Sequence, residues 1–251
     1  MAEAQARGEQ PMAMMAPVER TSRWIALKGI LRTLGISMPT VWESFRHRLD
    51  MAQINARFQG YCQDLMADAE IRMTVEGESH IQSGAIYMSN HQSLYDIPAV
   101  GGLVPGIRMV TKAELFKVPV WGAALKASGF ISINRRNREQ AIASLKEAAA
   151  KMKAGTSIWI APEGTRSRDG KLHDFKKGGF VMAIETGATI VPVTVEGTYE
   201  VLPPKTAAVR LGRSVSVRFH APIDASQYTL EQRDDLMAAV RAAIAEAPAT
   251  P

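Results

Sequence analysis

The stretch Ala85-Ile86-Tyr87-Met88-Ser89-Asn90-His91 sets the fold, because an apolar run ends there in polar residues. A short apolar run bounded by polar residues is typical of a buried strand. A helix is expected over Ser93–Gly101, with Ser93 as its N-cap. These two elements leave His91 in a loop at the carboxyl end of a strand, where α/β sheets usually bind their ligands.

Strand-like and helix-like segments alternate on both sides of this stretch. Short runs bounded by turn residues predict strands at Ile71–Glu76, Gly84–Ser89, Arg108–Thr111, Phe130–Ile133, Ser157–Ala161, Thr189–Val195 and Val215–Phe219. Helical periodicity predicts helices at Ser93–Gly101, Pro119–Ala127, Arg138–Ala154, Lys177–Glu185 and Leu230–Ala245. This alternation predicts an α/β domain over residues 71–245, with a mixed, largely parallel central sheet flanked by helices.

Residues 21–70 have helical periodicity and are expected to form a separate amphipathic two-helix element. We expect one helix over Thr21–Leu34, a turn at Leu34–Ser37 and a longer helix over Pro39–Ala69. Two interpretations fit: a helical pair that packs on the main domain, or a membrane anchor that inserts Trp24 and turns Lys and Arg towards headgroups. Residues 1–20 and 246–251 are expected to be mobile tails.

The composition limits the class of protein. The chain has 251 residues, of which 46% are hydrophobic, and this supports one sizeable core. Its net charge of +5 favours polyanionic partners such as nucleic acid, anionic lipid or an acidic carrier protein, but no nucleic-acid-binding motif is present. Cys62 is the only cysteine, which excludes an intrachain disulfide and favours a cytosol-facing enzyme. No segment has the ~20 consecutive apolar residues that a transmembrane helix needs, and no signal peptide is expected.

His91 and Asp96 form the first candidate catalytic pair, with the spacing His-x4-Asp. On one continuous helix, residues five apart point about 140° away from each other, so their contact requires His91 in the loop and Asp96 in the helix. A carboxylate on one imidazole nitrogen fixes the tautomer, and the other nitrogen can then take a proton from a hydroxyl. The pair would act as a general base on a substrate hydroxyl. The alternative is a histidine that only satisfies backbone groups of the loop.

Cationic residues follow other predicted strands and are candidates for phosphate binding. Arg166 lies in the turn Glu163-Gly164-Thr165-Arg166-Ser167, and its planar guanidinium suits phosphate oxygens. Lys112 and Arg135 also follow strands, so they are expected to meet His91 and Arg166 at one edge of the sheet. The alternative is an exposed polar turn. The glycine and lysine spacing does not match a phosphate-binding loop, and the histidines do not have a zinc-ligand spacing.

Four ordered blocks resemble the 1-acylglycerol-3-phosphate acyltransferases (lysophosphatidic acid acyltransferases) of the glycerolipid acyltransferase superfamily. They lie within about Ile71–Pro204 and are Asn90-His91-x4-Asp96, Lys112-x-Glu114-Leu115 with Pro119, Gly122, Gly129 and Arg135, Pro162-Glu163-Gly164-Thr165-Arg166-Ser167, and Val191-Pro192-Val193. Two departures stand out. Ala161 occupies the position where the third block usually begins with Phe, and no segment of this sequence is expected to form the transmembrane span that many relatives carry.

The resemblance implies that the chain moves a fatty acyl group from a thioester donor, acyl-CoA or acyl carrier protein, to the sn-2 hydroxyl of lysophosphatidic acid, giving phosphatidic acid. His91 would be the general base and Asp96 would orient it. The residues implied to bind substrate are Lys112, Arg135, Glu163, Gly164, Thr165 and Arg166. No metal or other cofactor is implied, because the thiolate is already a competent leaving group.

The partners implied by the resemblance are a lysophospholipid, an acyl thioester and an anionic membrane surface, with acyl carrier protein as a further candidate and no nucleic acid. The expected location is peripheral, on the cytoplasmic face of the cell membrane. Two alternatives stay open: a related O-acyltransferase that uses a lyso-ornithine lipid or glycerol 3-phosphate, and a non-catalytic protein that binds anionic membranes. Intact His91 and Asp96 argue against the second alternative.

Overall fold

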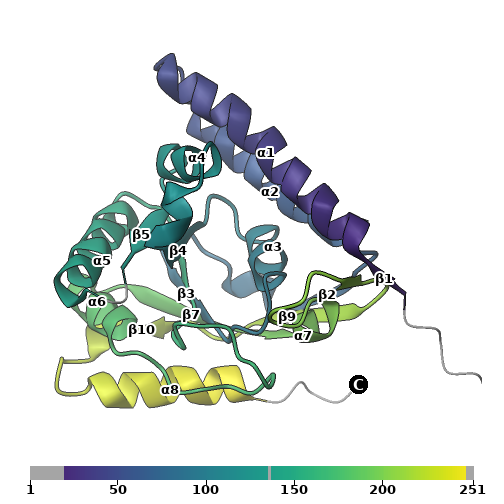
Figure 1. Cartoon of the computed structure of the whole chain (residues 1–251). Helices are drawn as coiled ribbons and strands as arrows, with labels where there is room; N and C mark the ends of the chain where they lie inside the picture. The colour runs from purple at the N-terminus through teal and green to yellow at the C-terminus, as the bar shows by residue number, and fades with distance from the viewer. Residues whose placement is uncertain (1–19, 135–136, 247–251) are drawn as a thin grey trace, which may run out of the picture.

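A mixed eight-stranded sheet forms the centre of the molecule, in a computed structural model that describes residues 20–134 and 137–246 (Figure 1). The strands are β2 (Arg72–Glu76), β3 (Ile86–Ser89), β4 (Arg108–Lys112), β5 (Ile131–Ile133), β6 (Ile158–Ile160), β7 (Thr189–Glu196), β9 (Ser214–Phe219) and β10 (Ile223–Asp224). Their order is β2-β9-β7-β3-β6-β4-β5, and β10 also pairs with β7. β7, β3, β6, β4 and β5 run parallel, whereas β9 and β10 are antiparallel to β7. The predicted fold class is therefore confirmed.

Helices cover both faces of this sheet and bury two separate hydrophobic cores (Figure 1). On one face lie α2 (Met51–Asp68) and α3 (Asp96–Gly101); on the other lie α5 (Arg138–Lys153), α6 (Gly178–Thr186) and α8 (Arg233–Ala245). Successive side chains of β3 point to opposite faces of the sheet and therefore enter different cores. Tyr87 enters the core beneath α3, and Ile86 and Met88 enter the core that contains Phe180 of α6.

The N-terminal helical pair differs from its prediction in where the chain turns. The turn expected at Leu34–Ser37 is wrong, because α1 runs without a break from Arg23 to Phe45 and includes Pro39. Tertiary packing against α2 and α4 (Trp121–Ala127) outweighs the local helix-breaking signal. The reversal comes instead just before α2, where the Asp50 carboxylate accepts a hydrogen bond from the Ala52 N–H at 2.9 Å.

Short elements that the sequence did not predict complete the fold. β1 (Thr21–Ser22) is not the start of α1 but pairs antiparallel with β8 (Val209–Arg210). Ser22 caps α1 by accepting a hydrogen bond from the Ile25 N–H at 3.3 Å. A four-residue helix, α7 (Thr198–Val201), follows β7. The tails predicted over residues 1–20 and 246–251 lie, apart from Arg20 and Glu246, outside the described residues.

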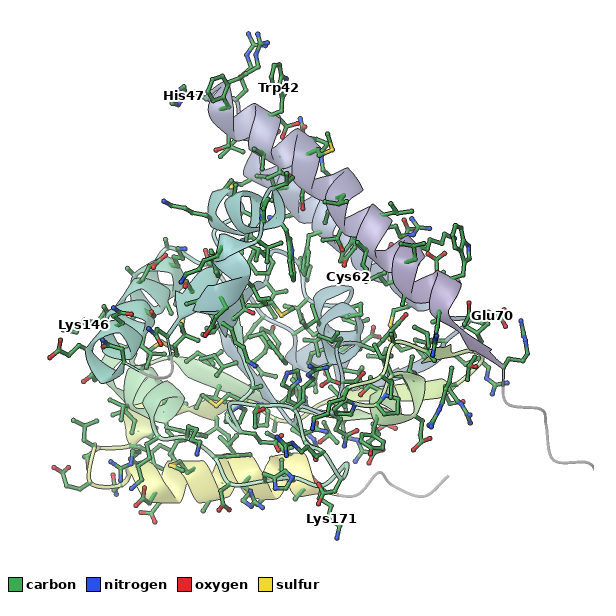
Figure 2. The ribbon with its side chains drawn as sticks, viewed as in Figure 1. Trp42, His47, Cys62, Glu70, Lys146 and Lys171 are labelled. Atoms are coloured by element: carbon green, nitrogen blue, oxygen red, sulfur yellow. The ribbon has the colours of Figure 1, made fainter. Side chains whose placement is uncertain are left out.

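Cys62 lies on α2 and is fully buried (Figure 2). Its sulfur faces α3, where a Cβ atom on Gly101 would lie 3.1 Å from Sγ. Burial raises the pKa of the thiol to about 12. Met66 of α2, and Ala69 directly after the helix, lie in the core beneath α3, so α2 packs against the sheet domain.

Candidate active site

The loop between β3 and α3 is organised around the buried carboxylate of Asp96. Asp96 Oδ2 accepts hydrogen bonds from His91 Nδ1 at 2.7 Å, from the Gln92 N–H at 2.7 Å and from the Ser93 N–H at 3.0 Å. The predicted N-cap is wrong, because α3 begins at Asp96 and has no side-chain cap. Ser93 instead donates its hydroxyl to the Leu202 carbonyl at 2.9 Å.

His91 lies at the carboxyl end of β3 with its side chain 15% exposed. The edge of its ring meets Trp159, with the ring centroids 5.4 Å apart and the planes at 81°. Oδ2 accepts hydrogen bonds from two backbone N–H groups, which favours Nδ1 as a third donor, and in that tautomer of the neutral imidazole Nε2 keeps its lone pair. The structure thus provides an oriented, partly accessible imidazole that can take a proton from a hydroxyl.

Glu163 fixes the backbone of His91 from the loop that follows β6. Its Oε1 accepts a hydrogen bond from the His91 N–H at 2.7 Å, and its Oε2 accepts one from the His173 N–H at 3.0 Å. The carbonyl of His91 is also held, because it accepts a hydrogen bond from the Ser167 N–H at 2.7 Å. Burial raises the pKa of the Glu163 carboxyl, and the two N–H donors oppose that rise. Both of its oxygens are engaged by the protein, which favours a supporting role over direct binding of an acceptor.

The other candidate substrate-binding residues lie at the carboxyl ends of neighbouring strands. Lys112 is the last residue of β4 and is exposed. Gly164, with φ of 76°, turns the loop after β6, where Thr165 is exposed and Arg166 is half-buried. Since β3, β6 and β4 are adjacent and parallel, these residues follow the same edge of the sheet as His91. Arg135 lies outside the described residues.

Two residues to which the sequence analysis gave no role, Asn90 and Thr198, connect the His91 loop and α3 to β7 and the helix α7 that follows it. Asn90 forms a pair of hydrogen bonds with the backbone of Val195: its Nδ2 donates to the carbonyl at 2.7 Å, and its Oδ1 accepts from the N–H at 2.8 Å. Thr198 donates its hydroxyl to Asp96 Oδ1. A signal existed, because Gly197-Thr198 follows a strand whose parallel partner is β3.

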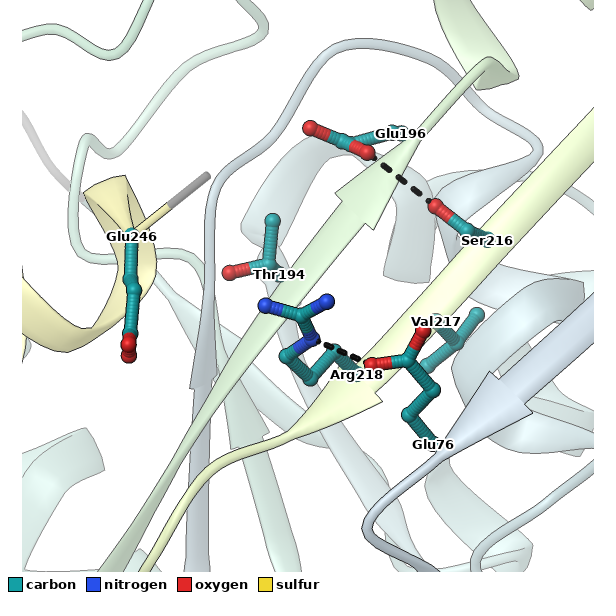
Figure 3. A pocket seen from close by; sticks show the side chains of 7 residues that line it. All are labelled: Glu76, Thr194, Glu196, Ser216, Val217, Arg218 and Glu246. Carbon is teal, nitrogen blue, oxygen red and sulfur yellow. Dashed lines mark hydrogen bonds and ion pairs between the residues drawn. The ribbon is translucent and has the colours of Figure 1, made fainter. Parts of the chain in front are cut away.

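A pocket elsewhere on the sheet does not belong to this site (Figure 3). Thr194 and Glu196 line it, and they alternate along β7 with Val193 and Val195, which enter the core beneath α3. The pocket therefore opens towards α8, and its Arg218 is paired with Glu76 at 2.7 Å. Within residues 20–134 and 137–246, no group of three acidic, histidine or cysteine side chains could hold a metal ion.

An exposed apolar stripe runs along α1. Its members are Trp24, Leu27, Ile30, Leu31, Leu34, Met38, Trp42 and Phe45. Ion pairs hold α1 to α2: Lys28 and Arg32 each contact Asp68 at 2.7 Å. Trp42 lies near the free tip of the pair, far from the sheet (Figure 2). None of the described helices is long and apolar enough to cross a bilayer.

The chain is similar to known acyltransferases in sequence and in structure. A family model described as Acyltransferase matches residues 72–196. The 1-acyl-sn-glycerol-3-phosphate acyltransferase of Escherichia coli K12 is 37% identical over 175 residues, which are 68% of this chain and 69% of that protein. The chloroplastic LPAT1 acyltransferase of Arabidopsis thaliana is 34% identical over 159 residues, or 62% of this chain and 45% of that protein.

A solved structure agrees with these sequence matches. The crystal structure of the 1-acyl-sn-glycerophosphate acyltransferase PlsC from Thermotoga maritima superimposes with a TM-score of 0.72 at 27% identity, and the match covers 89% of this chain and 95% of that one. The chain spans about half the length of the plant relatives that it matches. The segment matched by the family model contains His91, Asp96 and Glu163.

Proposed function

Because the chain belongs to the acyltransferase family, we propose that it transfers a fatty acyl group from a thioester to the sn-2 hydroxyl of 1-acyl-sn-glycerol 3-phosphate, giving phosphatidic acid. This is the reaction named for its sequence relatives in Escherichia coli and Arabidopsis thaliana. Phosphatidic acid is a precursor of phospholipids, so the proposed role is in phospholipid biosynthesis.

In the proposed mechanism, His91 and Asp96 act as a general-base dyad. Nε2 of His91 takes the proton from the acceptor hydroxyl while the hydroxyl oxygen attacks the thioester carbonyl carbon. The buried Asp96 carboxylate stabilises the imidazolium that forms. When the tetrahedral intermediate collapses, the carbon–sulfur bond breaks and the proton passes from His91 to the departing sulfur. The single observation that carries this proposal is the 2.7 Å contact between Nδ1 and Oδ2, at the carboxyl end of a central strand.

Cationic side chains at the same sheet edge are proposed to bind the acceptor phosphate. Arg166 suits a phosphate because its guanidinium can donate two parallel hydrogen bonds. Lys112 adds a point charge. The proposal that Arg135 and Thr165 also bind the acceptor rests on the family resemblance alone. The donor is either acyl-CoA or acyl carrier protein, since both are anionic and suit a chain of net charge +5.

The proposed location is the cytoplasmic face of the cell membrane, with α1 lying in the headgroup region. An interfacial helix buries an apolar face among lipid tails and keeps cations at the phosphates. The stripe from Trp24 to Phe45 provides the apolar face. Arg46 stacks over the ring of Trp42, with 5.5 Å from Cζ to the ring centroid, which places a cation at the tip of the helix.

Acyl transfer by the purified full chain tests this proposal. Lysophosphatidic acid, glycerol 3-phosphate and a lyso-ornithine lipid are compared as acceptors, each with acyl-CoA and with acyl carrier protein. The His91→Ala variant should lose about 10³-fold or more in rate. His80→Ala is the matched control, because the His80 ring contacts the Phe219 carbonyl at 2.9 Å, away from the dyad. A folded His91→Ala protein with wild-type activity would exclude the mechanism. Acyl transfer to the lyso-ornithine lipid alone would show that lysophosphatidic acid is not the acceptor.

A further inference from the structure

We propose that Thr198 is a positioning residue that holds Asp96, and through it His91, in the geometry needed for proton transfer. This inference deepens the proposed function and rests on it. The carboxylate of Asp96 has two oxygens with unequal surroundings. Oδ2 receives three hydrogen bonds, from His91 Nδ1 and from two backbone N–H groups of the loop. Oδ1 receives the hydroxyl of Thr198, its sole donor among the described residues.

Both Asp96 and Thr198 are completely buried, so bulk solvent does not reach this contact. A buried carboxylate oxygen without a donor is strongly disfavoured. If the hydroxyl were absent, the carboxylate would gain by rotating about χ2 towards other donors, since terminal torsions of this kind have broad minima. Any such rotation weakens the Oδ2 contact to Nδ1 and lets the imidazole turn. The hydroxyl therefore fixes the plane of the carboxylate.

The backbone delivers Thr198 to this position by an unusual route. Gly197 has a φ of 81°, and a Cβ atom there would lie 2.1 Å from the Ser214 carbonyl oxygen. Only glycine fits so close to β9 in this conformation. The chain thereby turns sharply out of β7 and points Thr198 at α3.

Two further contacts fasten the same segment to the catalytic loop. Asn90 pairs with the backbone of Val195, and Ser93 donates its hydroxyl to the Leu202 carbonyl. These contacts flank Thr198 on both sides in the sequence. If the segment after β7 served only to connect strands, it would not need three separate side-chain contacts with the His91 loop and the start of α3. The arrangement fits a support that restrains the dyad.

Substitution of Thr198 tests the proposal. Thr198→Val keeps the shape and removes the hydroxyl, Thr198→Ala provides a second hydroxyl-free variant, and Thr198→Ser restores the donor. Thr194→Val is the control, because Thr194 is also a buried threonine and bonds the Ile244 carbonyl at 2.8 Å, on the α8 side. The rate and KM of acyl transfer to lysophosphatidic acid are measured for each. In parallel, the low-field proton NMR signal of the His91 Nδ1–H is recorded and assigned by its loss in His91→Gln.

We expect kcat of Thr198→Val and Thr198→Ala to fall about 10- to 100-fold with KM changed less than threefold, because the base is misoriented but substrate binding is intact. Thr198→Ser should recover most of the rate, and Thr194→Val should match the wild type. The low-field signal should shift or broaden in the hydroxyl-free variants only. A wild-type rate in either folded hydroxyl-free variant, or a serine variant as slow as the valine one, would overturn the proposal.

The NMR signal separates this inference from the proposed function. If the wild type shows no acyl transfer to lysophosphatidic acid, the acceptor assignment fails. The signal still reports whether Thr198 controls the contact between His91 and Asp96. An unchanged signal in Thr198→Val and Thr198→Ala would refute the positioning role whatever the enzyme's substrate.

Discussion

The outward-facing stripe of α1 leads to a prediction about membrane binding. Trp42 and Phe45 are 59% and 79% exposed, so replacing both with serine should leave the fold intact. Full burial of a large apolar side chain stabilises by roughly 1.5–3 kcal/mol. Scaled by the exposed fractions, insertion of the two side chains would contribute together roughly 2–4 kcal/mol. Since about 1.4 kcal/mol corresponds to a tenfold change in affinity, the double variant should partition into vesicles about 30- to 1,000-fold more weakly.

Co-sedimentation with vesicles measures this partitioning directly. Anionic phosphatidylglycerol vesicles are compared with neutral phosphatidylcholine vesicles at low and high salt, so that charge and apolar insertion are separated. Leu230→Ser is the matched control, because Leu230 is 46% exposed but precedes α8, on the other side of the sheet. Partitioning of the double variant within twofold of wild type, with an unchanged thermal midpoint, would refute the assignment of α1 to the membrane surface. Substitution is preferable to deletion of the pair, since α2 contributes to the core.

Three further predictions concern the site and its supports. Asp96→Asn should lower kcat by about 10³–10⁴-fold, because an amide cannot hold the imidazole in the required tautomer; steady-state kinetics check this, and a loss below tenfold would contradict it. Gly197→Ala should destabilise the protein by about 2 kcal/mol or more in urea unfolding, because its φ of 81° and the Ser214 carbonyl exclude a side chain. The hydrogen bond from Arg32 is the main cause that lowers the pKa of Asp68 from its usual 3.8, so this pair stabilises the fold above that pH and the contribution disappears as pH falls through the lowered pKa. Asp68→Asn should therefore reduce the thermal midpoint at pH 7 and flatten its decline below about pH 4, whereas an equal decline in both proteins would argue against the linkage.

Much of the fold could be predicted because neighbouring residues in the sequence determine where its strands and helices lie. Apolar runs bounded by turn residues located β3, β6 and β7 to within two residues, and alternation predicted the α/β class. The loop position of His91 followed from the boundary between strand and helix. The continuity of α1 through Pro39 could not be predicted in this way, because packing against α4 and α2 outweighs the local signals.

The supports of the site depend on contacts between distant parts of the chain. Thr198 meets Asp96 across 102 residues, and Asn90 meets Val195 across 105. Periodicity carries no information about such pairs. The N-cap assigned to Ser93 failed for a related reason: the Asp96 carboxylate occupies the N–H groups of the turn, and Ser93 bonds Leu202 instead. The roles of Lys112, Arg166 and Arg135 in binding phosphate stay predictions.

The burial of Cys62 has a practical consequence for assays of this chain. A reagent that develops colour with thiolates should find none on the folded protein, because the single sulfhydryl is shielded and its pKa is about 12. Coenzyme A released from an acyl-CoA donor could then be followed continuously without background from the enzyme. If α2 came away from α3, one additional thiol per chain would react. The same colour reaction would thus measure turnover of the native protein through released coenzyme A. Without the acyl-CoA donor, it would report separation of the helical pair α1–α2 from α3.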